Sequence, residues 1–135
     1  MKGTTHRIAG AITGLAYSYF THQSVQGAVI VTVASIVGSL VPDIDEPHSI
    51  VGRKVKLASK LIKKIFGHRG MIHSPLFMLL STIGLKYLLL HFEFSNIQII
   101  LVGYFLGYLS HLILDTFTPM GINWFFPFGR KIGIR

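Results

Sequence analysis

The sequence predicts an all-α fold: an integral membrane bundle of about four transmembrane helices, plus one cytoplasmic amphipathic helix. Half of the 135 residues are apolar and only 13% are charged, against roughly 25% in an ordinary soluble domain. Four hydrophobic stretches carry most of the apolar residues, at about 7–20, 25–41, 75–92 and 97–117. A chain of this length has room for one domain, which we expect to cover residues 1–135.

Each hydrophobic stretch is close to the length that a bilayer requires. A transmembrane helix needs roughly 17–25 apolar residues, and the four stretches approach or reach that length. The first is the weakest candidate because Thr13, Tyr17 and Ser18 dilute it. Lys86 lies in the third, where its long side chain can reach toward the headgroups.

The stretch from 51 to 66 alternates apolar and basic residues at helical spacing. Lysines and arginines lie between apolar residues that recur every three or four positions. These apolar residues are Val51, Val55, Ala58, Leu61, Ile62, Ile65 and Phe66. The pattern indicates a basic amphipathic helix on the membrane surface. The alternative is a solvated helix that packs on its own protein.

The basic residues also predict the orientation. All except Lys86 lie near the N-terminus, between 53 and 69, or in the last six residues. The positive-inside rule then places both termini and the 42–74 loop in the cytoplasm. A basic chain can instead bind nucleic acid, but the apolar face of the 51–66 segment disfavours a DNA-associated regulator. We expect the membrane, and not nucleic acid, to be the partner.

The polar residues with metal-binding chemistry fall at the predicted cytoplasmic ends of the helices. They are His6, Asp43, Asp45, His68, His73, His111 and Asp115. The chain has no cysteine, so a metal ion must be held by imidazole and carboxylate, which favours zinc, with manganese or iron as alternatives. Seven candidates exceed the three protein ligands of a typical catalytic zinc, so we expect one or two ions.

Helical spacing supports this grouping. Residues four apart lie on one helix face, so His6 lies in line with Gly10 and Gly14, and Gly103 and Gly107 lie in line with His111 and Asp115. Small residues at this spacing let membrane helices approach closely. The polar side chains should therefore point into the bundle.

Simpler interpretations remain for the same residues. His111 and Asp115 could share a plain hydrogen bond, the aspartates after Pro42 could cap a helix end, and His68 and His73 could lie on the surface. The three other histidines are expected to be packing residues outside the site. These are His22, His48 and His91.

The ordered motifs resemble a known family. They are His6, Gly-Ser-Leu-Val-Pro-Asp-Ile-Asp at 38–45, His-Arg-Gly-Met-Ile-His-Ser at 68–74, Gly-Tyr-Leu-Ser-His-Leu-Ile-Leu-Asp-Thr-Phe-Thr-Pro-Met-Gly at 107–121, and Pro-Phe at 127–128. Together they are similar to the YdjM-type bacterial inner-membrane metal-dependent hydrolases. The resemblance implies a multi-pass protein of the bacterial inner membrane with a metal-dependent hydrolase activity. The histidine and aspartate positions match the polar motifs of that family.

The expected reaction is hydrolysis of a phosphoester in a phospholipid or another amphiphile at the cytoplasmic face. Metal ions can activate water and hold a phosphoryl oxygen, and Arg69 could bind the anionic oxygens through two bonds. The candidate catalytic residues are Asp45, Arg69 and Asp115. The alternative is a metal-binding transporter or a non-catalytic membrane scaffold. Transporters tend to bind near the bilayer midplane within repeats, whereas these residues lie at one end.

Overall fold

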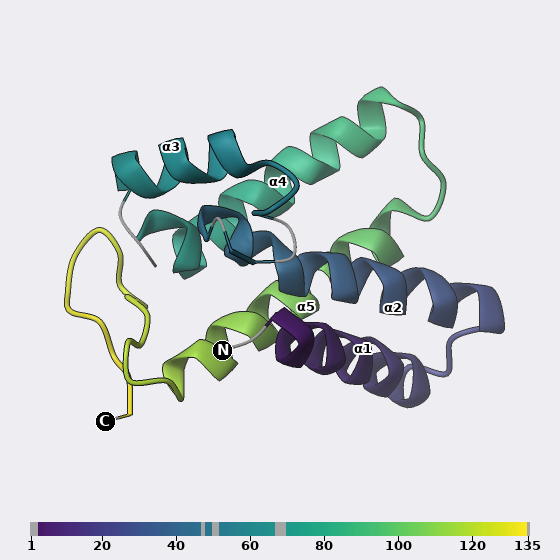
Figure 1. Cartoon of the computed structure of the whole chain (residues 1–135). Coiled ribbons are helices and arrows are strands. Elements are labelled where there is room, and N and C mark those ends of the chain that lie inside the picture. Colours follow the sequence, from purple (N-terminus) through teal and green to yellow (C-terminus); the bar gives the residue numbers. More distant parts are fainter. Residues whose placement is uncertain (1–2, 47, 50–51, 67–69, 135) are drawn as a thin grey trace.

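The chain folds into five α-helices and two short 3-10 helices (Figure 1). The computed structural model describes residues 3–46, 48–49, 52–66 and 70–134, without the side chains of Asp45, Ala58, Ile62, Lys63, Ile65 and Phe66. The elements, in chain order, are α1 (Gly3–Phe20), α2 (Val25–Leu40), η1 (Val41–Asp45), α3 (Lys56–Phe66), η2 (Met71–His73), α4 (Pro75–His91) and α5 (Ile97–Thr116). The described residues contain no β-strand, only an isolated antiparallel bridge between Ile122 and Ile132. The predicted all-α class is confirmed.

Side chains and prolines set the helix boundaries that matter for the site. Ser74 caps α4 by accepting a hydrogen bond from the Phe77 backbone N–H, and Pro75 occupies the first turn, where no backbone donor is needed. The chain that enters α4 is thereby fixed directly after His73. At the end of α2, Pro42 begins the change from α-helix to the 3-10 turn of η1, which carries Asp43.

Glycines bring α1, α2 and α5 into close contact. A Cβ on Gly10 would collide with the side chain of Ser39, and one on Gly14 with the backbone of Thr32 in α2. On the other side of α2, a Cβ on Gly107 would overlap the backbone carbonyl of Ser35. The close approach predicted from the glycine spacing is confirmed, and it places the α1 and α5 stripes against the same helix.

The outward surfaces of the helices are apolar. Ile12 of α1, Val33 of α2 and Leu80 of α4 are each at least half exposed. Two helical segments are long and apolar enough to cross a membrane, Val25–Ile44 and Ile97–Thr116. α4 is apolar but has only 17 residues, and α1 does not reach the same hydropathy over its 18 residues. The described chain therefore supports two of the four predicted spans by length and composition.

The ends of the four long helices gather on two opposite sides of the bundle. The α1–α2 and α4–α5 turns lie together on the right of Figure 1. The start of α1, the segment containing η1 and α3, and the C-terminal residues lie toward the left. We call this second side the site end, since it contains the predicted metal ligands that the structure describes.

Candidate metal site

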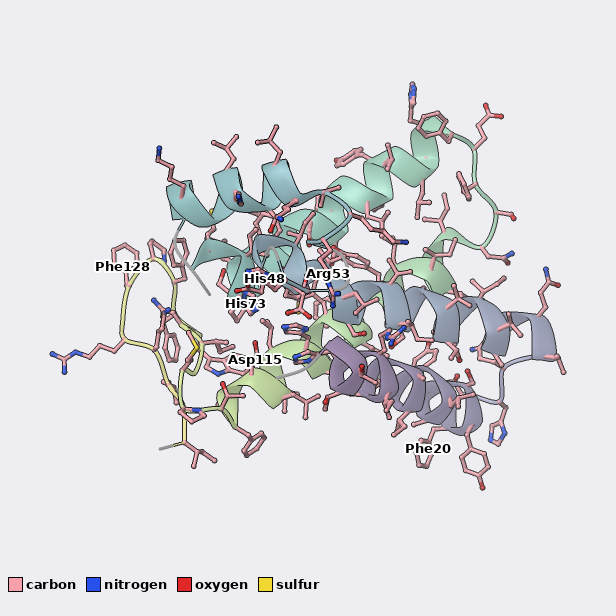
Figure 2. All side chains as sticks on the ribbon, in the orientation of Figure 1. Phe20, His48, Arg53, His73, Asp115 and Phe128 are labelled. Carbon is pink, nitrogen blue, oxygen red and sulfur yellow. The ribbon has the colours of Figure 1, made fainter. Side chains whose placement is uncertain are left out.

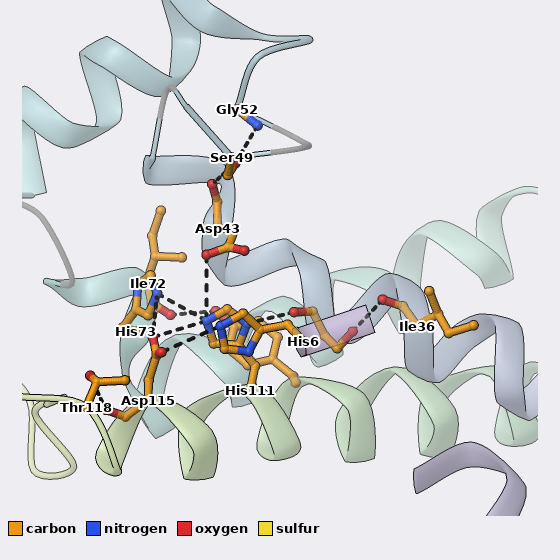
Figure 3. A network of polar contacts seen from close by, with 12 residues as sticks. His6, Ile36, Asp43, Ser49, Gly52, Ile72, His73, His111, Asp115 and Thr118 are labelled. Carbon is orange, nitrogen blue, oxygen red and sulfur yellow. Dashed lines mark hydrogen bonds and ion pairs between the residues drawn. The ribbon is translucent and has the colours of Figure 1, made fainter. Parts of the chain in front are cut away.

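Four segments distant in sequence bring five predicted ligands together at the site end. His6 comes from the first turn of α1, Asp43 from η1, His73 from η2, and His111 and Asp115 from the last two turns of α5. Figure 2 shows His73 and Asp115 where α1 begins, far from Phe20 at the other end of α1. Figure 3 shows the contacts that join the cluster.

Three ligand atoms form a nearly equilateral triangle. His111 Nε2 lies 3.3 Å from His73 Nε2 and 3.3 Å from Asp115 Oδ2. His73 Nε2 lies 3.4 Å from the same carboxylate oxygen. Tetrahedral coordination with bonds of about 2.0–2.1 Å places neighbouring ligand atoms about 3.3–3.4 Å apart. The triangle therefore has the dimensions of one face of a tetrahedral zinc site.

His6 and Asp43 lie beside this triangle, His6 on a face of the His111 ring and Asp43 near its Nε2 atom. His6 stacks on His111 with ring centroids 3.7 Å apart, and its Nε2 lies 3.6 Å from Asp115 Oδ1. Asp43 Oδ1 is 3.9 Å from His111 Nε2. Two sets of groups could hold an ion, His6 with His111 and Asp115, and Asp43 with His73 and His111.

A backbone contact fixes which nitrogen of His111 faces the cluster. His111 Nδ1 lies 2.7 Å from the carbonyl oxygen of Ser39 at the end of α2. Because a carbonyl only accepts, Nδ1 carries the proton and donates it. Nε2 then directs a lone pair toward His73 and the two carboxylates. One lone pair binds one ion, so the triangle and the two groups, which all share His111, describe one ion and not several.

Further hydrogen bonds hold the ligand segments in place. The Tyr108 hydroxyl in α5 donates to the carbonyl of Ile72, the residue before His73, at 2.5 Å. The Ser49 hydroxyl donates to the Asp43 carbonyl at 2.7 Å, which secures η1. Contacts of this kind orient ligands and raise metal affinity in known sites.

The cluster is buried, so its carboxylate and imidazole groups are destabilising unless a cation binds between them. His6 and His111 are fully buried, and Asp115 is 1% exposed. Within the described part of the chain, neither ring nitrogen of His6 has a hydrogen-bond partner. A buried carboxylate surrounded by imidazole nitrogens is stabilised by a positive charge between them. The donor set thus fits a divalent ion of the zinc, manganese or iron type.

The remaining predicted ligands are not placed in the cluster. Asp45 ends η1, but its side chain lies outside the described residues, as do His68 and Arg69 altogether. Two of the histidines expected to be packing residues outside the site, His22 and His91, are exposed at the opposite end, so the expected packing role was wrong for them. His48 is also exposed, although it follows η1.

Two supporting residues were not predicted from the sequence. Ser39 contributes its carbonyl across 72 positions of sequence, and Tyr108 contributes a hydroxyl to a turn 36 positions away. Tyr108 lies on the buried face of α5, one turn before His111. This position on the predicted packing face could have indicated a supporting role, because a buried tyrosine hydroxyl needs a hydrogen-bond partner. No pattern in the sequence marks the Ser39 carbonyl.

The fold and the cluster define a class: an all-helical membrane protein with a buried histidine and aspartate site at one end of its bundle. Comparison with known proteins gives the family. The family model described as "YdjM inner membrane protein" matches residues 1–135. The chain belongs to this family of inner membrane proteins, as its motifs predicted.

Individual relatives agree with this assignment. The chain is 35% identical to the "Uncharacterized protein YvsG" of Bacillus subtilis (strain 168), over 94% of this chain and 74% of that protein. It is 43% identical to the "Inner membrane protein YdjM" of Escherichia coli (strain K12) and of Shigella flexneri, over 70% of this chain. The match spans 47%, about half, of the length of each of these two proteins. No solved structure matches the chain.

Proposed function

We propose that the chain is a membrane-embedded metal-dependent hydrolase that cleaves a phosphoester of a lipid or another amphiphile at the cytoplasmic membrane face. The observation that carries the proposal is the triangle of His73 Nε2, His111 Nε2 and Asp115 Oδ2, with sides of 3.3–3.4 Å. Three protein ligands with one open position are typical of catalytic zinc, whereas structural zinc sites are closed by four.

In this proposal the three triangle residues hold one divalent ion, zinc in the first instance. A bound ion of this type would supply Lewis-acid activation of water and of a phosphoryl oxygen. The Ser39 carbonyl keeps the His111 ring in the tautomer that such binding needs. Manganese and iron remain alternatives with the same donor types.

The two flanking residues have separate roles. Asp43 is 14% exposed and its Oδ1 lies 3.9 Å from His111 Nε2, so it can hold a water molecule beside the triangle and accept its proton. His6 is stacked on His111 and limits the movement of that ring. Asp45 follows Asp43 by two positions and is a second candidate for the proton-accepting role.

Arg69 is the candidate for binding the substrate's anionic oxygens. It lies in sequence between two predicted ligands, His68 and His73. A guanidinium can contact a phosphate through two parallel hydrogen bonds, which a lysine ammonium cannot reproduce. A positively charged anchor that only reports orientation is the alternative for this residue.

The proposal includes four membrane crossings with both termini in the cytoplasm. The basic residues that the structure describes, other than Lys86, belong to segments at the site end of the bundle, and the turns at the opposite end carry Glu93 and no lysine or arginine. This asymmetry favours a cytoplasmic site end by the positive-inside rule. α4 and α1 would then cross with help from neighbouring helices and flanking residues.

The experiment is a hydrolysis screen on detergent-purified protein with anionic lipids and model phosphoesters, before and after metal removal. Turnover should disappear with the metal and return when zinc, manganese or iron is added. Arg69→Lys should keep the metal content and raise KM, while Arg130→Lys in the exposed tail should match the native protein. If the metal-loaded protein leaves every substrate intact and instead moves the ion across vesicles, the transporter alternative is correct. If it does neither, the scaffold alternative remains.

A further inference from the structure

α3 presents an apolar and basic surface that its own protein does not cover. Leu57 is 85% exposed and Leu61 is 57% exposed, whereas Ser59 on the opposite side of the helix is fully buried. The two leucines are four residues apart and so lie on one stripe. The exposed lysines Lys56, Lys60 and Lys64 form the adjacent stripe. Of the two interpretations of this segment, the exposed leucines favour the membrane surface over a helix that buries its apolar side on the protein.

The C-terminal residues form a second surface of the same chemistry. Ile122 and Ile132 exchange two backbone hydrogen bonds of 3.0 and 2.8 Å, which closes a hairpin-like loop. Phe125 and Phe128, between them in sequence, are 71% and 80% exposed. The basic residues Arg130 and Lys131 follow and are exposed as well.

Contacts with α5 hold this loop in place, so the exposure of Phe125 and Phe128 is a fixed feature of the fold. Ile122 is fully buried against Tyr108 and Leu112 of the core. The Trp124 ring N–H donates to the Thr116 hydroxyl at 3.0 Å. Gly121 has φ +57°, and a Cβ there would collide with the Ile132 carbonyl, so the sharp turn out of α5 requires glycine.

Both surfaces lie at the site end. α3 packs on η1, and the C-terminal residues that carry the loop follow α5, which ends one residue after Asp115 (Figure 1). Figure 2 shows Phe128 projecting at this end, away from the helical bundle. We call the two surfaces together the basic rim. It comprises Lys56, Leu57, Lys60, Leu61, Lys64, Phe125, Phe128, Arg130 and Lys131.

The charge of the rim and its exposed apolar side chains together indicate which kind of molecule it binds. Apart from the three aspartates of the site motifs, the acidic residues of the chain are Glu46 and Glu93, so the rim has little acidic charge to neutralise it. Nucleic acid would account for the basic residues but not for four exposed leucine and phenylalanine side chains. A headgroup layer over hydrocarbon accommodates both, because basic residues attract anionic lipids while apolar tips insert.

We propose that the basic rim binds anionic phospholipid headgroups and inserts Leu57, Leu61, Phe125 and Phe128 into the bilayer, so that anionic lipids gather beside the His/Asp cluster. The lysines and arginines of the rim select anionic over zwitterionic headgroups. This binding is independent of whether the cluster hydrolyses a substrate, because it rests on the outer surface alone.

The test uses tryptophan fluorescence in nanodiscs. Trp124 is the only tryptophan, so a Trp124→Phe background permits single reporters at Leu57→Trp and Phe128→Trp. This background loses the bond to Thr116 but keeps the two backbone bonds between Ile122 and Ile132 that close the loop. Both should be quenched by phosphatidylglycerol with brominated acyl chains more strongly than by brominated phosphatidylcholine. Phe20→Trp, exposed at the other end of α1, is the matched control and should be quenched equally by the two lipids.

A charge variant separates insertion from selection. Replacing Lys56, Lys60 and Lys64 with glutamine should remove the phosphatidylglycerol preference at Leu57→Trp, whereas Lys86→Gln should retain it; added salt should weaken the preference. Equal quenching of the rim reporters by both lipids would overturn the proposal, as would emission typical of water with no quenching. Protection of the rim reporters by duplex DNA in place of lipid would also contradict it. None of these results depends on hydrolysis.

Discussion

Gly107→Ala tests the packing that positions the site. A Cβ at this position would overlap the carbonyl oxygen, carbonyl carbon and Cα of Ser35. These are backbone atoms, so no rotamer change can relieve the overlap and α2 must move away from α5. We expect a loss of about 2–3 kcal/mol of stability, the upper part of the range for overpacked cores. The movement also separates His111 from the Ser39 carbonyl, so metal affinity should fall.

The matched control is Gly84→Ala in α4. A Cβ there has no atom within 4 Å, so stability should not fall and should rise by up to about 1 kcal/mol, because alanine has the higher helix propensity. Reversible unfolding of both variants in detergent micelles, followed by helical circular dichroism, measures the difference. Equal stability and equal metal content in the two variants would refute the close packing of α2 on α5.

Two further predictions concern the support of the site and the topology. Tyr108→Phe leaves the buried Ile72 carbonyl without its donor, which should cost about 1–3 kcal/mol in thermal unfolding. Metal binding should weaken as well, because the turn that carries His73 loses this anchor. Tyr87→Phe, at a 68% exposed position, should change neither stability nor metal binding. Reporter fusions at Arg135 and within the 22–25 turn should report opposite sides of the membrane, and a shared side would exclude four crossings with cytoplasmic termini.

Helical spacing is the reason that much of the site could be predicted. Residues four apart share a face, so the line of Gly103, Gly107, His111 and Asp115 had to be buried if the glycines mark a packing face. The structure buries all four. The charge pattern independently placed His6 and Asp43 at the same end as these residues, because consecutive membrane helices alternate in direction.

Contacts that depend on the details of tertiary packing could not be predicted. The His111 contact is to a backbone carbonyl, which every residue possesses, so the sequence does not distinguish Ser39 from its neighbours. The exposure of Leu57 depends on how α3 rotates on η1, and the pattern assigned the apolar face to other residues. The number of spans could not be predicted either, since α1 falls short of the required hydropathy and α4 falls short of the required length.

The central claim is that His73, His111 and Asp115 hold a metal ion, and metal analysis of purified protein variants tests it most directly. The native protein should contain a divalent ion that His111→Ala and Asp115→Ala remove, while His22→Ala and His91→Ala, at exposed positions of the opposite end, retain it. Circular dichroism should confirm that all four variants remain helical. Equal metal content in the native protein and the four folded variants, or no metal in any of them after purification with added zinc, manganese or iron, would contradict the claim.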